Sequence, residues 1–141
     1  MLFDLLSGVW RLKRRIVGSQ KGLVLGKATF TPLAEGTLTY KEQGRLRSGG
    51  FSYQVEQNYI FEVKSDHNLI VRFSDGQSYL DLRFNGDLEA EGLHICGQDR
   101  YQAFYRLKPG QLESHVIVLG PQKDYEIFTS LHKGEPRFSQ S

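Results

Sequence analysis

Hydrophobic and polar residues alternate along most of this chain, in short runs separated by breaks that contain glycine. Alternation with a period of two is typical of β-strands that bury one face, and the spacing of an amphipathic helix is almost absent. A short helical turn over residues 3–6 is the one helix that the pattern predicts, and we expect it to plug one end of the fold. The pattern predicts eleven strands, at residues 8–17, 25–32, 36–43, 50–54, 58–64, 69–73, 78–84, 87–95, 100–107, 112–119 and 124–132.

The breaks between these runs have the composition of tight turns. Asp75-Gly76 and Asn85-Gly86 are the clearest, because glycine supplies the positive φ that short hairpin turns need. Short strands joined in sequence predict an antiparallel barrel or a sandwich, and a meander favours the barrel because closure removes exposed edges. We therefore predict an all-β, antiparallel up-and-down β-barrel of about ten strands. Barrels of this size commonly enclose a cavity.

The composition fits one globular domain. The chain has 141 residues, of which 39% are hydrophobic and 24% charged, enough to bury a core without crosslinks. We expect a single domain over residues 1–134 and a C-terminal tail over residues 135–141. One cysteine cannot form an internal disulfide, and we recognise neither a secretory signal nor an apolar run of about 20 residues. We therefore expect a cytoplasmic protein without a membrane partner.

The formal net charge of +2 conceals an uneven distribution. Residues 1–50 carry nine Lys+Arg and three Asp+Glu, whereas residues 51–141 carry nine and thirteen. The basic residues of segment 11–17 follow a strand pattern, which is typical of a solvated strand face. The whole-chain charge is also low for a surface that neutralises phosphates, so we expect no nucleic-acid partner.

Arg14 is the first candidate for chemistry. Its face of the first predicted strand is otherwise apolar, with Trp10, Leu12 and Ile16. Strand alternation therefore predicts that Arg14 points inward, where a guanidinium needs acceptors. Glu42, on the same strand face as Tyr40, is a candidate partner. Three roles for Arg14 are open. It could stabilise the fold by an ion pair with Glu42, it could cover Trp10 at the barrel end, or it could bind an anionic ligand group with two hydrogen bonds.

A cluster of reactive side chains surrounds a predicted turn at residues 97–98. His94 and Cys96 share a face before the turn, and Asp99 and Tyr101 share a face after it, so a hairpin would bring the four together. A histidine beside an aspartate or tyrosine could act as an acid or base, and a cysteine beside a histidine as a nucleophile. The structural alternatives are a satisfied core histidine, a small buried cysteine and an aspartate that caps the turn.

A second charged and aromatic cluster follows the predicted turn at residues 120–122. Lys123 and Tyr125 share a face with the apolar Ile127, so the sequence predicts both at the mouth of the barrel. Lys123 would attract a negatively charged ligand there. The alternative is a surface turn with a lysine that extends its charge into solvent.

Metal and nucleotide sites are not indicated. His94 and Cys96 are suitable zinc ligands, but no second pair stands at zinc-like spacing, and His67, His115 and His132 lie on separate predicted elements. The sequence contains no phosphate-binding loop or dinucleotide motif, and no strand–helix unit that could hold one. We expect no metal site.

Several motifs together resemble known families. They are W-x-L-x-R-x-I at 10–16, G-x-A-x-F at 26–30, Y-x-E-x-G at 40–44, F-x-D-G at 73–76, H-x-C-x-x-D-x-Y at 94–101 and G-P-x-K-D-Y at 120–125. The Gly8-x-Trp10 start is similar to that of lipocalin-like (calycin) barrels. The whole combination resembles an uncharacterised family of about 140 residues, catalogued as a domain of unknown function.

The resemblance implies a lipocalin-like β-barrel and a set of recurring polar positions, but no established activity. The family tends to carry a histidine after the F-x-D-G motif, where this chain has residues 78–80, Ser-Tyr-Leu. A role that requires that second histidine is therefore not expected here. The recurring positions include Arg14, Glu42, His94, Cys96, Asp99, Tyr101, Lys123 and Tyr125.

Three hypotheses for the function follow. The first is a module that binds a small, partly apolar ligand, with Arg14 favouring an anionic group. Its predicted contacts are Arg14, Tyr40, Glu42, His94, Cys96, Tyr101, Lys123 and Tyr125. The second is a small enzyme in which His94, oriented by Asp99 or Tyr101, is an acid or base, or in which His94 ligates haem. The third is a filled structural or interaction domain; the sequence gives no indication of oligomeric state.

Overall fold

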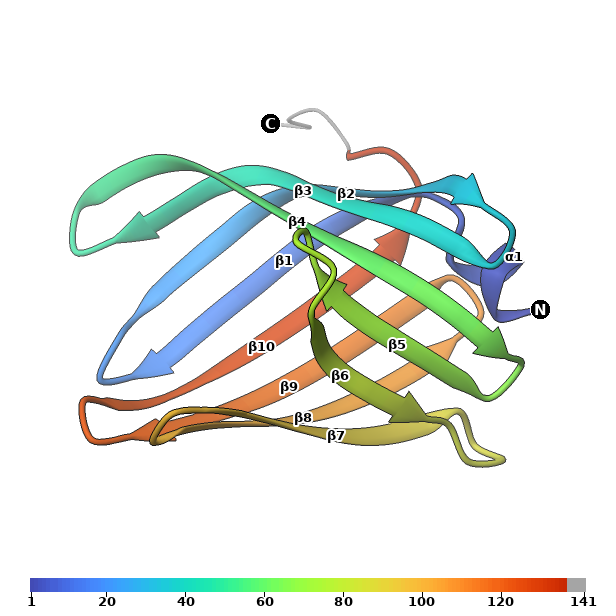
Figure 1. The fold of residues 1–141 in the computed structure, drawn as a ribbon. Helices are drawn as coiled ribbons and strands as arrows, with labels where there is room; N and C mark the ends of the chain where they lie inside the picture. Colours follow the sequence, from blue (N-terminus) through green and yellow to red (C-terminus); the bar gives the residue numbers. More distant parts are fainter. Residues whose placement is uncertain (137–141) are drawn as a thin grey trace.

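In a computed structural model, which describes residues 1–136, the chain forms an antiparallel up-and-down β-barrel (Figure 1). The sheet order is β6-β5-β4-β3-β2-β1-β10-β9-β8-β7, so strands adjacent in sequence pair, except β6 and β7, and β1 pairs with β10. The elements are α1 (Leu2–Leu6), β1 (Gly8–Gly18), β2 (Gly22–Ala34), β3 (Thr37–Ser48), β4 (Phe51–Ser65), β5 (Asn68–Phe73), β6 (Ser78–Arg83), β7 (Glu89–Cys96), β8 (Asp99–Lys108), β9 (Gln111–Gly120) and β10 (Lys123–Lys133). The predicted barrel is confirmed. Most of the predicted tail, residues 137–141, lies outside the described residues.

The main difference from the sequence pattern concerns β4. Residues 50–54 and 58–64 were predicted to form two strands, but β4 is one continuous strand. That prediction was wrong because the polar residues between them look like a loop. In the structure residues 51–58 pair with β3 alone, so this half of β4 is largely exposed to water and shows little alternation.

The barrel closes between β6 and β7, which lie side by side without a backbone ladder between them. The side chains of Leu80 and Leu82 reach across this seam toward Gly92. A Cβ atom at position 92 would lie 3.1 Å from both leucines, so glycine allows the two strands to approach. Packing of apolar side chains therefore takes the place of hydrogen bonds at this seam.

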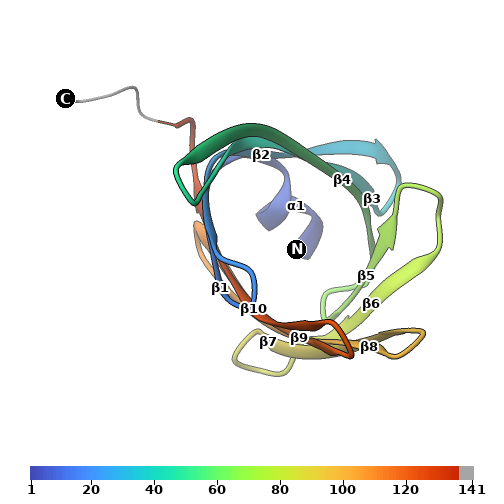
Figure 2. The ribbon, with the colours of Figure 1, turned by 90° about the vertical axis from the view of Figure 1, so that its left-hand side faces the viewer.

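One end of the barrel is closed. Figure 2, which looks along the barrel from the opposite end, shows α1 within the ring of strands. Leu2 and Leu6 of α1 are fully buried, and the indole Nε1 of Trp10 donates a hydrogen bond of 2.8 Å to the Leu6 carbonyl. The Lys133 ammonium lies 4.8 Å from the centre of the Trp10 ring and donates to the Leu5 carbonyl at 3.0 Å. The predicted helical plug is therefore confirmed.

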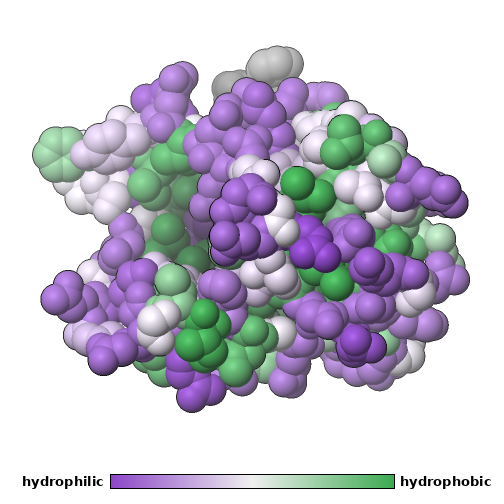
Figure 3. Space-filling model, viewed as in Figure 1, coloured by the Kyte–Doolittle hydropathy of each residue, from purple (hydrophilic) through white to green (hydrophobic). Residues whose placement is uncertain are grey.

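The other end is open. Because the strands alternate in direction, the hairpins β1–β2, β3–β4, β5–β6, β7–β8 and β9–β10 all turn at this end. Figure 3 shows the surface hollowed there, on the left of the view, with apolar residues inside the recess. Arg14, Tyr40 and Glu42 face this interior, as strand alternation predicted.

Candidate functional site

A cavity of about 310 Å³ lies between the plugged end and the open mouth. Strands β2 to β6 give it an aromatic wall that includes Phe30, Tyr40, Tyr59, Phe61 and Tyr79. Strands β1, β9 and β10 give an aliphatic wall that includes Leu12, Ile16, Leu112, Val116, Ile127 and Leu131. The cavity thus has several aromatic rings on one side and mostly branched aliphatic side chains on the other, where Tyr105 and Tyr125 also lie.

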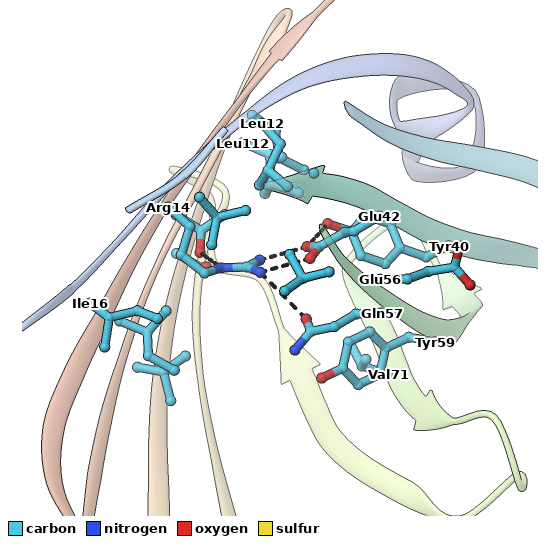
Figure 4. A pocket seen from close by; sticks show the side chains of 18 of the residues that line it. Leu12, Arg14, Ile16, Tyr40, Glu42, Glu56, Gln57, Tyr59, Val71 and Leu112 are labelled. Atoms are coloured by element: carbon cyan, nitrogen blue, oxygen red, sulfur yellow. Dashed lines mark hydrogen bonds and ion pairs between the residues drawn. The ribbon is translucent and has the colours of Figure 1, made fainter. Parts of the chain in front are cut away.

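An ion pair crosses this cavity (Figure 4). The Arg14 guanidinium donates to both carboxylate oxygens of Glu42, at 2.7 and 2.6 Å, and its Nε donates to Thr129 Oγ1 at 2.9 Å. The hydroxyl of Tyr40 also donates to Glu42, and Gln57 Oε1 lies 3.4 Å from Arg14. The predicted contact between Arg14 and Glu42 is confirmed. Both terminal nitrogens of the guanidinium already donate to the Glu42 carboxylate.

Electrostatics hold this cluster in one protonation state. Burial alone would lower the pKa of Arg14, but the hydrogen bonds and charge of Glu42 outweigh it and leave that pKa above its usual value. Burial, followed by the charge of Glu42, raises the pKa of Tyr40. At neutral pH the cavity therefore contains a cationic Arg14 and a neutral Tyr40.

Further tyrosines give the cavity neutral hydrogen-bond donors. Burial raises the pKa of Tyr59, Tyr79, Tyr105 and Tyr125, all of which line the cavity. These phenols remain protonated at neutral pH. Within residues 1–136 the hydroxyls of Tyr59 and Tyr79 donate to no protein acceptor, so they can donate to a ligand.

The predicted hairpin at residues 97–98 forms at the mouth. His94 lies opposite Tyr101 and Cys96 opposite Asp99, as the sequence predicted. The Lys123 ammonium donates to the Tyr101 hydroxyl at 2.8 Å and contacts an Asp99 carboxylate oxygen at 3.0 Å. These hydrogen bonds, first to Tyr101 and then to Asp99, raise the pKa of Lys123. The lysine charge is thus balanced at the mouth.

The structure does not place His94 against Asp99, one of the two orienting partners that the sequence predicted. The contacts of His94 are aromatic: its ring centre lies 5.2 Å from Tyr79, 5.4 Å from Phe73 and 5.8 Å from Tyr101. Asp99 instead binds Lys123 from the neighbouring hairpin. The alternative of a small buried cysteine is also wrong, because Cys96 is exposed.

The predicted contact residues fall into three groups along the barrel. Those that line the cavity are Arg14, Tyr40, Glu42 and Tyr125. His94 and Tyr101 lie one ring closer to the mouth and contact Tyr79, which itself lines the cavity. Cys96 and Lys123 lie at the rim of the mouth. The eight positions thus share one end of the barrel but do not form one contact shell.

Sequence reasoning missed several residues of the cavity. They are Gln57, Tyr59, Tyr79, Ser114 and Thr129 among others. Alternation carries the signal for most of them: Tyr59 shares its strand face with the buried Phe61, and Thr129 shares its face with the buried Leu131. Gln57 could not be found in this way, because its part of β4 was predicted to be a loop.

A second hollow, of about 800 Å³ and more open, lies on the outer face over β7 to β10. Phe104, His115 and Phe128 are among its lining residues, and the rings of His115 and Phe128 stack at 4.3 Å. Arg15 covers the Phe128 ring at 4.6 Å, and Glu126 binds His115 at 2.7 Å. These side chains are engaged with one another, so the inner cavity is the stronger candidate site.

Two searches for other kinds of site gave nothing within the described part of the chain. No group of three or more His, Cys, Asp or Glu side chains lies close enough together to hold a metal ion in residues 1–136. Over the same residues, no helix has the length and apolar character needed to cross a membrane.

Comparison with solved structures shows the same fold in proteins of low sequence identity. An S-type phycobiliprotein lyase, CPES, from Guillardia theta matches with a TM-score of 0.70 and 10% identity, over 96% of this chain and 92% of that one. Rv2717c from M. tuberculosis matches with a TM-score of 0.58 and 12% identity, over 95% and 96%. The barrel EF1p2_mFAP2b bound to DFHBI matches with a TM-score of 0.55 and 13% identity, over 93% and 95%.

At these identities the likeness is one of fold. A comparison with curated protein sequences gave no match. A family model does match, over residues 6–133, which span all ten strands of the barrel. The chain therefore belongs to DUF6314, a family of unknown function.

Proposed function

We propose that this barrel binds a small, planar and partly apolar ligand in its inner cavity. The observation that carries the proposal is a cavity with aromatic rings on one side and aliphatic side chains on the other, lined by several tyrosines. Ligand pockets in proteins commonly measure about 300–1,000 Å³ and combine apolar walls with a few placed polar groups. A cavity of about 310 Å³ is at the small end of that range, which favours a compact ring system inside it.

The polar groups favour a neutral ligand with hydrogen-bond acceptors. The presence of Arg14 in the cavity led us to expect an anionic group on the ligand, but both terminal nitrogens of its guanidinium are bound to Glu42. A free carboxylate in this position would have to displace Glu42 and leave a second negative charge buried, which is costly. The donors left for a ligand include the neutral phenols of Tyr59 and Tyr79.

The similar barrels support a container role. One of them is bound to DFHBI, and another similar barrel, mFAP1, is also bound to DFHBI, with a TM-score of 0.53 and 16% identity over 93% of this chain and 97% of that one. The fold can therefore hold a small molecule. For location, we keep the proposal of a cytoplasmic protein, on the ground that the single cysteine is exposed and suits a reducing compartment.

The other two hypotheses receive less support. An acid or base role for His94 is less favoured, since Asp99 binds Lys123, and the hydroxyl of Tyr101, the other predicted orienting partner, accepts a hydrogen bond from Lys123. Haem ligation by His94 is favoured by none of the contacts of its ring, which packs beside Phe73 and Tyr79. A filled structural domain does not account for the inner cavity. We therefore propose ligand binding without catalysis by His94.

Blocking the cavity tests this proposal. Val55 lines the cavity near the mouth, so Val55→Trp would fill it. We expect the unaltered protein to bind naphthol, a compact planar phenol, and Val55→Trp to weaken the affinity at least ten-fold in a fluorescence titration. Val17→Trp, on the outer face of β1, is the matched control and should leave the affinity unchanged. Equal affinities for all three proteins would place the naphthol outside the cavity and contradict the proposal.

A further inference from the structure

The β3–β4 hairpin forms one lip of the mouth. Residues 51–58 of β4 pair with β3 only, because pairing with β5 begins at Tyr59. Figure 1 shows the hairpin tip at the open end, on the side of the mouth opposite β7 and β8. The inner face of this lip is thus continuous with the interior of the barrel.

Two aromatic side chains occupy that inner face. The side chains of Phe61, Tyr59, Gln57 and Val55 alternate along one face of β4 and line the cavity. The next two positions on the same face are Tyr53 and Phe51, which lie beyond the cavity. Their rings stack with centres 6.3 Å apart, and 52% and 65% of these residues are exposed.

The rest of the hairpin is polar, so the aromatic pair is not part of a general apolar surface. The opposite face of the hairpin carries Arg45, Arg47, Gln54 and Glu56. Arg45 donates a hydrogen bond of 3.1 Å to Ser52 across the two strands. Only the face that continues the cavity wall is aromatic, and the packing of the protein core does not require it there.

We propose that Phe51 and Tyr53 form an outer subsite of the cavity, and that the natural ligand is an elongated, planar, conjugated molecule. This inference rests on the proposed binding function and adds the length of the ligand to it. From Gln57, beside the ion pair, to Phe51 the strand extends about 20 Å at about 3.3 Å per residue. A compact ring system would end within the cavity, whereas an elongated one would continue along the aromatic face of the lip.

Two probes of different length test this inference. Diphenylhexatriene is elongated and conjugated, and naphthol is compact. We expect the double variant Phe51→Ser/Tyr53→Ser to weaken binding of diphenylhexatriene at least five-fold and to change naphthol affinity less than two-fold. Leu33→Ser is the matched control, because Leu33 is 63% exposed at the plugged end, and it should change neither affinity. Circular dichroism of each variant checks that the barrel is intact.

The possible outcomes separate this inference from the proposed function. If naphthol binds in the cavity and the double variant binds diphenylhexatriene as the unaltered protein does, the outer subsite is overturned and the cavity proposal stands. Equal weakening of both probes would overturn the inference of an elongated ligand. A dimer in sedimentation that the double variant abolishes would identify the pair as a contact between copies and overturn the subsite. Failure of the unaltered protein to bind either probe would overturn both proposals.

Discussion

Arg14 links three strands of the barrel from its interior. It comes from β1 and binds Glu42 on β3 and Thr129 on β10. Removing such charges from water is costly, so the cluster is stable only while every partner is present. The same contacts that connect the strands also cross the cavity, so stability and the proposed binding share these residues.

Removing one member of the ion pair should destabilise the barrel strongly. We expect Arg14→Met to lower the free energy of unfolding by about 3–5 kcal/mol, because Glu42 would remain buried without its partner. The double variant Arg14→Met/Glu42→Met should recover much of this loss. Urea unfolding of the single and double variants measures both effects.

An exposed ion pair provides the control. Arg106 contacts Glu89 at 3.2 Å, and the side chains are 52% and 45% exposed. Arg106→Met should therefore cost about 0–1 kcal/mol. If the double variant Arg14→Met/Glu42→Met loses as much free energy of unfolding as the single variants Arg14→Met and Glu42→Met added together, the two residues do not stabilise the barrel as a coupled pair.

The tyrosines of the cavity should make stability depend on alkaline pH. Burial raises the pKa of Tyr105, whereas a tyrosine in the unfolded chain has a pKa of about 10. Above pH of about 10 the unfolded state loses this proton first, so unfolding becomes easier as pH rises, and below that pH the contribution is fully present. We expect Tyr105→Phe to reduce this decline by up to about 1.4 kcal/mol per pH unit.

Urea unfolding between pH 8 and pH 11 measures the slope. A slope that Tyr105→Phe leaves unchanged would show that this phenol does not resist ionisation in the folded barrel.

The residues of the cavity differ in how far the sequence reveals them. Arg14 and Glu42 could be predicted, because each lies among apolar neighbours on a single alternating strand. The partner of Asp99 could not, because Lys123 reaches it from another hairpin and displaces the expected role of His94. Contacts between hairpins depend on the curvature of the sheet, which alternation on a single strand does not contain.

At the scale of elements, strand alternation predicted the inward faces well and the length of β4 poorly. A half-buried strand alternates because one face meets the core, and β1 and β3 show this pattern clearly. The outer half of β4 has water along its free edge and on much of both faces, so its residues are mostly polar. The part of the strand that the pattern failed to identify is the lip that we propose to be an outer subsite.

The short helix α1 shows the opposite case. The apolar residues of segment 3–6 gave enough pattern to predict a plug; in the structure the helix begins one residue earlier, and Leu2 and Leu6 are buried at the closed end. The sequence did not show the contacts beside Trp10, where the Lys133 ammonium, from the last strand, donates to the Leu5 and Ser7 carbonyls. These contacts join the first and last segments of the domain at the plugged end, so the open mouth at the other end is the way into the cavity.

The whole molecule has the form of a container. One end is plugged by α1, the middle holds a cavity crossed by an ion pair, and aromatic rings continue from Tyr40 through Tyr59 and Tyr79 to the mouth. A barrel of this size does not need an interior hollow for stability, since cavities in cores are destabilising. We propose that a ligand occupies the hollow.

Native mass spectrometry of the protein purified from cells tests this claim most directly, by comparison with its denatured mass. We predict an additional mass in the native spectrum that is lost on denaturation. The added mass should be absent from Val55→Trp prepared in the same way, because the tryptophan would fill the cavity. Native and denatured masses that agree for the unaltered protein would contradict the account of the barrel as a ligand container.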